Sequence, residues 1–482
     1  MITLLMFVPL VWRSLLTNVP AKTNLVNSLA IAQSAIYLIL TIYIIVNVHL
    51  PFYGFKGYLI ADPLAMYEVL ITSIVFLLAA IYGRGYVKAL IEKESVRGGS
   101  VGLFYTFFSL LLTTIVFSFF SNNLALFWIL LELTTVFSGV LIVVISAKEN
   151  IIAALKYVFI ASTAMIFSVI GLIILFAMTK QATGSGTLNW NELMQTAGSL
   201  SPKYFAFAFI FIFNGFASKA GIAPFHTWLP QAHARAPSMV SAVLSAVLLN
   251  CGIYGILRLF AVAHLTSSWT LISIVLIIFG VLSIVIATFS MLSRTNIKKL
   301  IAFSSIEHMG LVLVGIGLGT PIALLWTLYH ILAHSLIKTL LFFSAGILNH
   351  QYDGNKMQEM KNAFKLQPLA TWGIIIGSVA VIGMPPFPMF ISKLFILTQI
   401  GSYSLPLLLT ILILFLIVAS AFAFLLIRAF TQQSETQITP YAPHWTMKVP
   451  IVFLFVSMIG IVIYLSTGLS NLLAAITASL GF

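Results

Sequence analysis

The chain has 482 residues, of which 61% are hydrophobic and only 7% are charged. Soluble domains contain roughly 45–50% apolar and about 25% charged residues, so this composition excludes a soluble globular protein and indicates a polytopic membrane protein in a lipid bilayer. The net charge of +13 does not indicate a nucleic-acid partner, because the basic residues are scattered singly through short loops and form no basic stripe.

Apolar runs near or above the roughly 20 residues that span a bilayer recur along the whole chain. They predict an all-α polytopic membrane protein with about fourteen transmembrane helices. The run at the N-terminus has no preceding basic residues and no A-x-A-like site, so we interpret it as a short first helix and not as a cleavable signal peptide. The predicted spans are 2–16, 27–48, 62–83, 100–119, 123–146, 150–178, 204–230, 236–263, 268–291, 296–317, 321–347, 369–399, 404–430 and 448–468.

The loops between these spans differ in charge. Most lysines and arginines lie in the loops after odd-numbered helices, whereas the loops after even-numbered helices hold only Lys56, Lys180 and Lys203. The positive-inside rule places the basic loops in the cytoplasm. We therefore predict a multi-pass protein of the cell inner (cytoplasmic) membrane with both termini outside.

Two predicted helices contain helix-breaking residues beside a lysine. The seventh has Pro224 shortly after Lys219, and the twelfth has Pro386 shortly before Lys393. Proline removes a backbone donor, and at membrane depth such breaks occur where they are buried in protein or line a cavity. A matched pair of broken helices is typical of inverted repeats with sites at the breaks.

This pattern predicts two inverted repeats of about five helices each. Residues 100–263 would form the first repeat, helices 4 to 8, and residues 268–430 the second, helices 9 to 13. Residues 1–99 would contain helices 1 to 3, and residues 448–482 helix 14 and the tail.

Among the charged residues inside apolar, membrane-length segments, four are the main candidates: Glu132, Lys219, Lys338 and Lys393. A charge at the bilayer centre costs about 2.5–3.5 kcal/mol on insertion scales, so such residues are functional candidates that carry protons or ions. Lys393 has no carboxylate in its own segment.

Glu132 and Lys219 are predicted to pair. Opposite charges about 4 Å apart interact by roughly 4 kcal/mol at an effective dielectric of 20, which is about three pKa units. A pair that opens and closes would switch the lysine between holding and releasing a proton. The alternative is a static ion pair that only fixes helix packing.

His330, His334 and Lys338 recur every four residues and are therefore predicted to share one helix face. Histidine titrates near neutrality, so the row indicates a proton relay. The alternative of a metal site lacks a third ligand nearby in sequence. Two further candidates are Asn250 and Glu307. Asn250 cannot titrate and would order water between the lysines. Glu307 is either a crossing position for the proton or only a hydrogen-bond partner of a neighbouring helix.

Some polar residues are weaker candidates. His226, His233 and Arg235 form an entry funnel or are solvated residues of the membrane interface, and the second interpretation is favoured. The others in this group are Asp62, Glu68, Lys156 and Arg258. The single cysteine, Cys251, excludes an intrachain disulfide and a cysteine framework for iron–sulfur or zinc ligation, so no cofactor is expected in this chain, the alternative being a haem held by a pair of histidines.

Three motifs are familiar in combination. The segment KAGIAPFHTWLPQAH at 219–233, the segment AFSSIEHMG at 302–310 and the row His330-x3-His334-x3-Lys338 resemble the antiporter-like subunits of respiratory complex I. The same family includes Mrp-type cation/proton antiporters and energy-converting membrane-bound hydrogenases. The resemblance covers roughly residues 60–430, and residues 247–251 together with Ile306-Glu307 look closest to the hydrogenase-type branch.

The resemblance implies roles at matching positions. Glu132 looks like the family's fifth-helix glutamate, Lys219 like its seventh-helix lysine and Lys393 like its twelfth-helix exit residue, while the row on the eleventh helix looks like the central relay. Asn250 departs from the pattern, because many members have a lysine there. Water must then bridge the axis at that point.

The resemblance also implies a proton- or sodium-translocating subunit of a redox-driven complex, either a membrane-bound hydrogenase or a complex I-like oxidoreductase. The expected partners are other membrane subunits, including antiporter-like paralogues, and a peripheral redox arm. Iron–sulfur clusters with a nickel–iron centre, or flavin and quinone, are expected in those partners. The alternatives are a stand-alone Mrp-type antiporter subunit, a membrane subunit of an inorganic-carbon uptake complex, and a structural scaffold with inert ion pairs.

Overall fold

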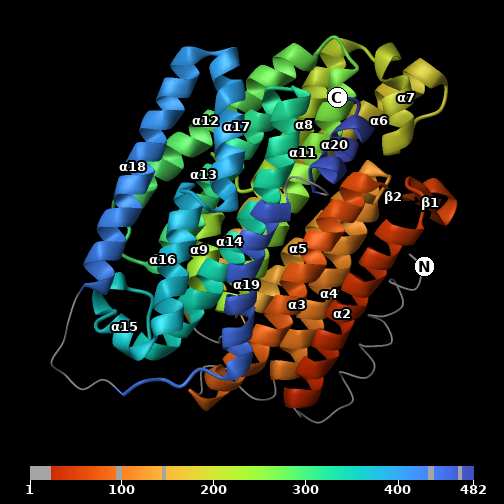
Figure 1. The fold of residues 1–482 in the computed structure, drawn as a ribbon. Helices are drawn as coiled ribbons and strands as arrows, with labels where there is room; N and C mark the ends of the chain where they lie inside the picture. Colours follow the sequence, from red (N-terminus) through yellow and green to blue (C-terminus); the bar gives the residue numbers. More distant parts are fainter. Residues whose placement is uncertain (1–22, 94–99, 144–147, 432–438, 465–468) are drawn as a thin grey trace.

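The computed structural model describes residues 23–93, 100–143, 148–431, 439–464 and 469–482. Helices dominate these residues, and β1 (Phe52–Gly54) and β2 (Leu59–Ala61) form a small antiparallel hairpin in which Tyr53 lies opposite Ile60. The predicted all-α membrane fold is confirmed (Figure 1). The first predicted helix, 2–16, lies outside the described residues.

The first long helices, α2 to α5, lie side by side along one side of the molecule, with α2 at its edge (Figure 1). Asp62 begins α3 as an N-cap, because its carboxylate accepts a hydrogen bond from the Ala65 amide and Pro63 follows at the first helical position. The bounds up to the first break are α2 (Thr23–Asn47), α3 (Pro63–Glu92), α4 (Val101–Phe120), α5 (Leu124–Val143), α6 (Lys148–Thr183), α7 (Trp190–Thr196) and α8 (Pro202–Lys219).

The first predicted break is present. Helix α8 ends at Lys219, Gly221 adopts a left-handed φ of +70°, and the chain resumes as the short helices η4 (Phe225–Trp228) and α9 (Leu229–Arg235). A φ in that region favours glycine, so Gly221 lets the chain turn directly after the buried lysine.

The central helices follow. A π-helical turn, η5 (Leu244–Leu248), joins α10 to α11, and such turns are frequent at functional sites. The most apolar 18-residue stretches of α10–α11 and of α13 are completely buried, and 94% of the corresponding stretch of α14 is buried. The bounds are α10 (Ser238–Val243), α11 (Leu249–His264), α12 (Trp269–Met291), α13 (Ile297–Gly317) and α14 (Pro321–Tyr352).

The second predicted break is also present. Helix α16 ends at Ile382, Gly383 adopts a left-handed φ of +90°, and α17 starts at Pro388. Helix α18 lies at the edge of the molecule opposite α2 (Figure 1). The bounds are α15 (Ala363–Leu366), α16 (Pro368–Ile382), α17 (Pro388–Tyr403), α18 (Leu405–Phe430), α19 (Trp445–Tyr464) and α20 (Ser470–Ser479).

Eleven helices of the described residues are long and apolar enough to cross a membrane. The spans predicted over 204–230 and 369–399 are each divided at their break, so the total of about fourteen remains a prediction. The outer helices α5, α6, α18 and α19 bury between 28% and 44% of their spans and expose apolar side chains, whereas the core lies around α11, α13 and α14.

Candidate functional site

The row of titratable residues on α14 is buried, and its members share one helix face as the spacing predicts. His330, His334 and Lys338 each have 0% of their surface exposed. Thr320 and Pro321 start this helix, where the Thr320 hydroxyl accepts a hydrogen bond from the Ala323 amide. A long, regular α14 therefore carries all three side chains through the centre of the fold.

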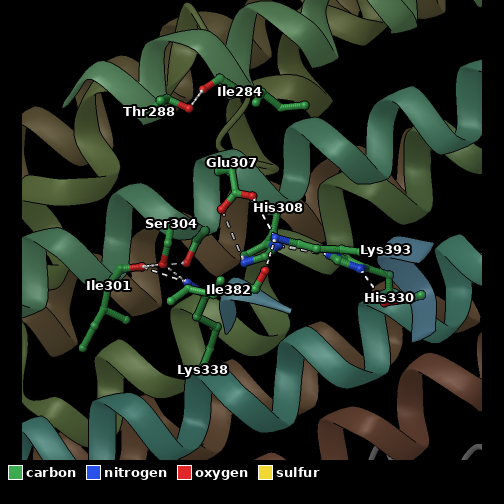
Figure 2. Close-up of polar contacts among 12 residues, drawn as sticks. Ile284, Thr288, Ile301, Ser304, Glu307, His308, His330, Lys338, Ile382 and Lys393 are labelled. Carbon is green, nitrogen blue, oxygen red and sulfur yellow. Dashed lines mark hydrogen bonds and ion pairs between the residues drawn. The ribbon is translucent and has the colours of Figure 1, made fainter. Parts of the chain in front are cut away.

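Lys393 forms an ion pair that the sequence did not predict. Its Nζ lies 3.1 Å from Oε1 of Glu307 in α13 and donates a 3.2 Å hydrogen bond to the Ile382 carbonyl (Figure 2). That carbonyl ends α16 at the break. The ammonium also lies 4.1 Å from the centre of the Phe415 ring. The break thus supplies a free backbone acceptor to the lysine that follows it.

Glu307 continues this contact toward α14 through two histidines. Its Oε2 lies 3.6 Å from Nε2 of His308, and Nδ1 of His308 lies 3.2 Å from Nε2 of His330. Nδ1 of His330 lies 2.8 Å from the Ser392 hydroxyl, beside Lys393 in α17. Figure 2 shows Glu307, His308, His330 and Lys393 gathered in one cluster. The two imidazoles are hydrogen-bonded, whereas Nε2 of His308 and Oε2 of Glu307 have no hydrogen-bond partner among the described residues, so a water between them would complete a row that can transfer a proton stepwise.

Lys338 extends the cluster along α14. Its Nζ donates hydrogen bonds to the Ile301 carbonyl at 3.0 Å and to the Ser304 hydroxyl (Figure 2). Within the part of the chain that the structure describes, Lys338 forms no ion pair and neither ring nitrogen of His334 has a hydrogen-bond partner. The His334 ring centre lies 5.7 Å from that of His308. Unpartnered buried polar atoms of this kind are typical sites for ordered water.

Lys219 lies at the end of α8 and is fully buried. Its Nζ donates to the Leu131 carbonyl at 2.9 Å and to the Thr135 hydroxyl, both in α5. Glu132 instead accepts a 3.0 Å hydrogen bond from Ser162 in α6, and its other carboxylate oxygen has no partner among the described residues. The predicted direct ion pair is therefore absent from this structure: Lys219 bonds to a backbone carbonyl and a hydroxyl of α5, while the Glu132 carboxylate bonds to α6.

Asn250 lies two residues after the π-helical turn and joins three helices. Its Nδ2 donates to Oε2 of Glu68 in α3 at 3.1 Å and to the Ser335 hydroxyl in α14 at 3.3 Å. In the sequence Glu68 is only a weak candidate. The sequence signal that could have made Glu68 a strong candidate is the same as for Glu132, namely a carboxylate within an apolar membrane-length run.

Asp62 and Arg258 form a buried pair near the hairpin. The two guanidinium nitrogens donate to the two carboxylate oxygens at 2.6 and 2.7 Å, and Arg258 also donates to the Tyr254 hydroxyl at 2.7 Å. The guanidinium lies 5.0 Å from the Trp190 ring centre. This bidentate geometry satisfies both charges and links α3 to α11, which indicates a structural role.

We expect Asp62→Asn to destabilise the fold. It leaves the buried Arg258 charge uncompensated, and breaking such a pair costs about 3–5 kcal/mol. The measurement is the midpoint of thermal aggregation of the detergent-purified protein. Glu359→Asn, at an exposed ion pair with Lys356, is the control and should change the midpoint little. Equal midpoints for both variants would contradict a structural role for the Asp62–Arg258 pair.

His233 corrects the interpretation of His226, His233 and Arg235 as solvated interface residues. His233 is fully buried, stacks on Phe342, and has no hydrogen-bond partner at either ring nitrogen among the described residues. His226 is also largely buried, and of the three only Arg235 is exposed, where it pairs with Glu149 at 2.6 Å. The burial of His233 arises because its short helix, α9, packs against α13 in the core.

The histidines of α13 and α14 contact one another and a serine. Among the described residues, no group of three or more His, Cys, Asp or Glu side chains is arranged to hold a metal ion. The rings of His308 and His330 are tilted by 45° to each other, and their nitrogens face each other and Ser392. This is the arrangement of a hydrogen-bonded chain.

Comparison with known proteins places this chain in a family. A family profile described as NADH:quinone oxidoreductase/Mrp antiporter, TM, matches residues 121–422, more than half of the chain. The chain belongs to this family. The resemblance seen in the sequence motifs is confirmed, and the match contains every predicted site residue from Glu132 to Lys393.

Family members of several kinds are similar in sequence. Hydrogenase-4 component F homolog of Methylacidiphilum infernorum is 29% identical over 71% of this chain and 72% of its own length. Hydrogenase-4 component B of Escherichia coli is 30% identical over 69% of this chain, but the chain spans only 49% of that relative. A Na(+)/H(+) antiporter subunit of Alkalihalophilus pseudofirmus is 26% identical over 70% of this chain and 65% of its length. The hydrogenase-type branch is thus among the relatives.

Solved structures of family complexes have the same fold. A chain of the membrane-bound sulfane sulfur reductase, an archaeal respiratory membrane complex, has a TM-score of 0.87 at 22% identity. The match covers 99% of this chain and 97% of that chain. A chain of the Mrp complex from Dietzia sp. has a TM-score of 0.84 at 18% identity, with the same two coverages. Identities this low show the fold alone.

Proposed function

We propose that this protein is a proton-translocating membrane subunit of a redox-driven complex, of the membrane-bound hydrogenase or complex I-like type. The observation that carries the proposal is the buried row Lys393–Glu307–His308–His330, with His334 and Lys338 beside it, in the core of the helices. A protein that only crossed the membrane would not keep so many ionisable groups at that depth.

The proposed path begins at Lys219, beside the first break, and ends at Lys393, beside the second. A proton loads Lys219 from the cytoplasm and passes through ordered water to Lys338 and the histidines. From His330 it moves through His308 to Glu307 and leaves along Lys393. We interpret the bond of Glu132 to Ser162, instead of to Lys219, as the open state of the proposed switch.

Glu307 takes a larger role in this path than its weak sequence signal indicated. Protonation of Glu307 would remove the charge that holds Lys393, and the freed lysine could then release its proton at the second break. Among the described residues Lys338 donates only to neutral acceptors, so it has no permanent counter-charge in this structure. Because Glu307 loses its charge when protonated and Lys338 has no counter-charge, a proton that arrives at one end of the row would promote release of another at Lys393.

Partners and placement follow from the same proposal. Hydrogenase, complex I-like and Mrp assemblies contain several membrane subunits, so we expect antiporter-like paralogues beside this chain and a peripheral redox arm on the cytoplasmic side. The iron–sulfur, nickel–iron, flavin or quinone groups would belong to that arm. The basic loops favour a cytoplasmic membrane with both termini outside.

The second candidate function is an Mrp-type cation/proton antiporter subunit. The fold match to the Mrp complex and the similarity to the Alkalihalophilus antiporter protein favour it. The same buried row would then exchange protons for sodium without a redox reaction.

The test is gentle detergent purification of the native complex through a tag on this chain, followed by mass spectrometry. We expect a peripheral arm with nickel–iron or quinone-reducing subunits to co-purify. If only small antiporter-like membrane proteins co-purify, the redox-driven assignment is wrong and secondary antiport replaces it.

A further inference from the structure

A buried carboxyl group lies outside the row of Figure 2. Glu68, in α3, is 2% exposed and has no cation within ion-pair distance among the described residues. Its side chain instead accepts a hydrogen bond from the Asn250 amide, which is neutral. A carboxylate that is buried without a cation is stabilised when it takes up a proton. Glu68 is therefore a group that can hold a proton in the core of the fold.

The contacts of Asn250 place Glu68 between the two halves of the proposed path. On one side, Asn250 bonds to Ser335, the residue that follows His334 in α14. On the other side, α11 approaches the first break so closely that a Cβ on Gly252 would lie 2.5 Å from the backbone nitrogen of Ala220, which follows Lys219. Asn250, which contacts α14, and Gly252, which contacts the first break, are only two residues apart on α11, so this part of α11 lies between the break and α14.

Asn250 itself cannot carry the proton across this gap. An amide has donors and an acceptor but does not titrate near neutral pH. Its Oδ1 is buried and has no hydrogen-bond partner among the described residues, although its Nδ2 has two. The free acceptor beside Glu68 is suited to the hydroxyl of a protonated carboxylic acid or to an ordered water.

We propose that Glu68 is a proton-binding residue of the translocation path, which receives protons from Lys219 and passes them to Lys338. The inference rests on the function proposed above. In the first step the Lys219 ammonium loses one proton and the Glu68 carboxylate becomes a carboxylic acid. In the second step Glu68 returns to the carboxylate and the Lys338 amine becomes an ammonium. Water relays the proton in both steps and is unchanged.

The competing explanation is that Glu68 only holds α3 to α11 by a hydrogen bond. Glu68→Gln separates the two explanations, because glutamine has the same size and keeps an oxygen acceptor for Asn250 but cannot exchange a proton. Glu68→Asp keeps the carboxyl group on a shorter side chain. Glu359→Gln, at an exposed position, is the matched control.

The first experiment measures proton pumping by the intact complex in everted membrane vesicles, with the electron donor of its co-purified arm and a pH-sensitive dye. We expect Glu68→Gln to reduce pumping by about 10²–10⁴-fold while the complex assembles normally, as for the loss of a proton-transferring group. Glu359→Gln should pump normally. An assembled Glu68→Gln complex that pumps like the wild type overturns the proposal.

The second experiment detects the proton directly. Infrared difference spectra of the purified complex after a pH change should contain a carboxylic acid C=O band that shifts in D2O and is missing from Glu68→Gln. A spectrum unchanged by Glu68→Gln overturns the proposal even if pumping falls. If Glu68→Gln does not assemble, Glu68→Asp decides: the band should move because the carboxyl group changes its surroundings, and an assembled Asp variant with an unchanged band overturns the proposal.

Failure of this inference is distinguishable from failure of the proposed function. Lys338→Ala is measured in the same vesicles. If it abolishes pumping while Glu68→Gln does not, the path exists without Glu68. If neither variant changes pumping, the proposed translocation function is wrong as well.

Discussion

Lys219→Ala is expected to abolish proton pumping while the complex still assembles. The lysine lies fully buried at the first helix break, and among the described residues it donates only to neutral oxygens of α5, so its removal leaves no charged partner stranded there. Loss of a proton-transferring group reduces rates by about 10²–10⁴-fold. The measurement is dye quenching in everted vesicles, normalised to the amount of complex.

Lys203→Ala is the matched control, because Lys203 lies near the start of the same helix α8 and is exposed. It should pump normally. Normal pumping by Lys219→Ala would show that the first break is not on the path. If the Lys219→Ala subunit fails to assemble into the complex, the lysine is needed to hold α5 and α8 together. Lys219→Met, which keeps most of the side-chain volume, tests that outcome.

Glu307→Gln is expected to impair both stability and pumping. It removes the only carboxylate within ion-pair distance of Lys393 among the described residues, and with it the negative charge 3.6 Å from Nε2 of His308. Removal of one partner of a buried ion pair costs about 3–5 kcal/mol, because the other charge remains unpaired. The measurements are thermal aggregation of the purified protein and pumping in vesicles.

The double variant Glu307→Gln/Lys393→Met separates the two effects. It removes both charges, so stability should return toward that of the wild type, whereas pumping should stay lost. A double variant as unstable as Glu307→Gln alone would show that the pair does not determine the stability loss. Recovery of pumping in the double variant would exclude the pair from the path.

Most of the fold could be predicted from the sequence. Long apolar runs have one stable arrangement in a bilayer, the helix, because every backbone polar group must be bonded internally. The breaks at Gly221 and Gly383 were also predictable, since glycine and proline act through local backbone geometry. The common face of His330, His334 and Lys338 follows from helical periodicity alone.

The candidate site was predicted less completely. The sequence identified the buried charges but paired Glu132 with Lys219, whereas the structure pairs Lys393 with Glu307, 86 residues away in the chain. Lys219 bonds to the Leu131 carbonyl and the Thr135 hydroxyl. Only the packing of α5 against its neighbouring helices decides that these groups, and not the Glu132 carboxylate, meet the lysine. The two repeats over 100–263 and 268–430 remain a prediction, because they too depend on how helices are arranged against one another.

The sequence by itself determined which residues are expensive to bury and on which helix face each lies, because transfer free energy and helical periodicity are local properties. The tertiary structure decided which of those residues meet. The contacts of Lys393 with Glu307, of His308 with His330 and of Glu68 with Asn250 each join different helices. Such contacts depend on how helices cross and rotate against one another, and periodicity within one helix carries no information about its neighbour.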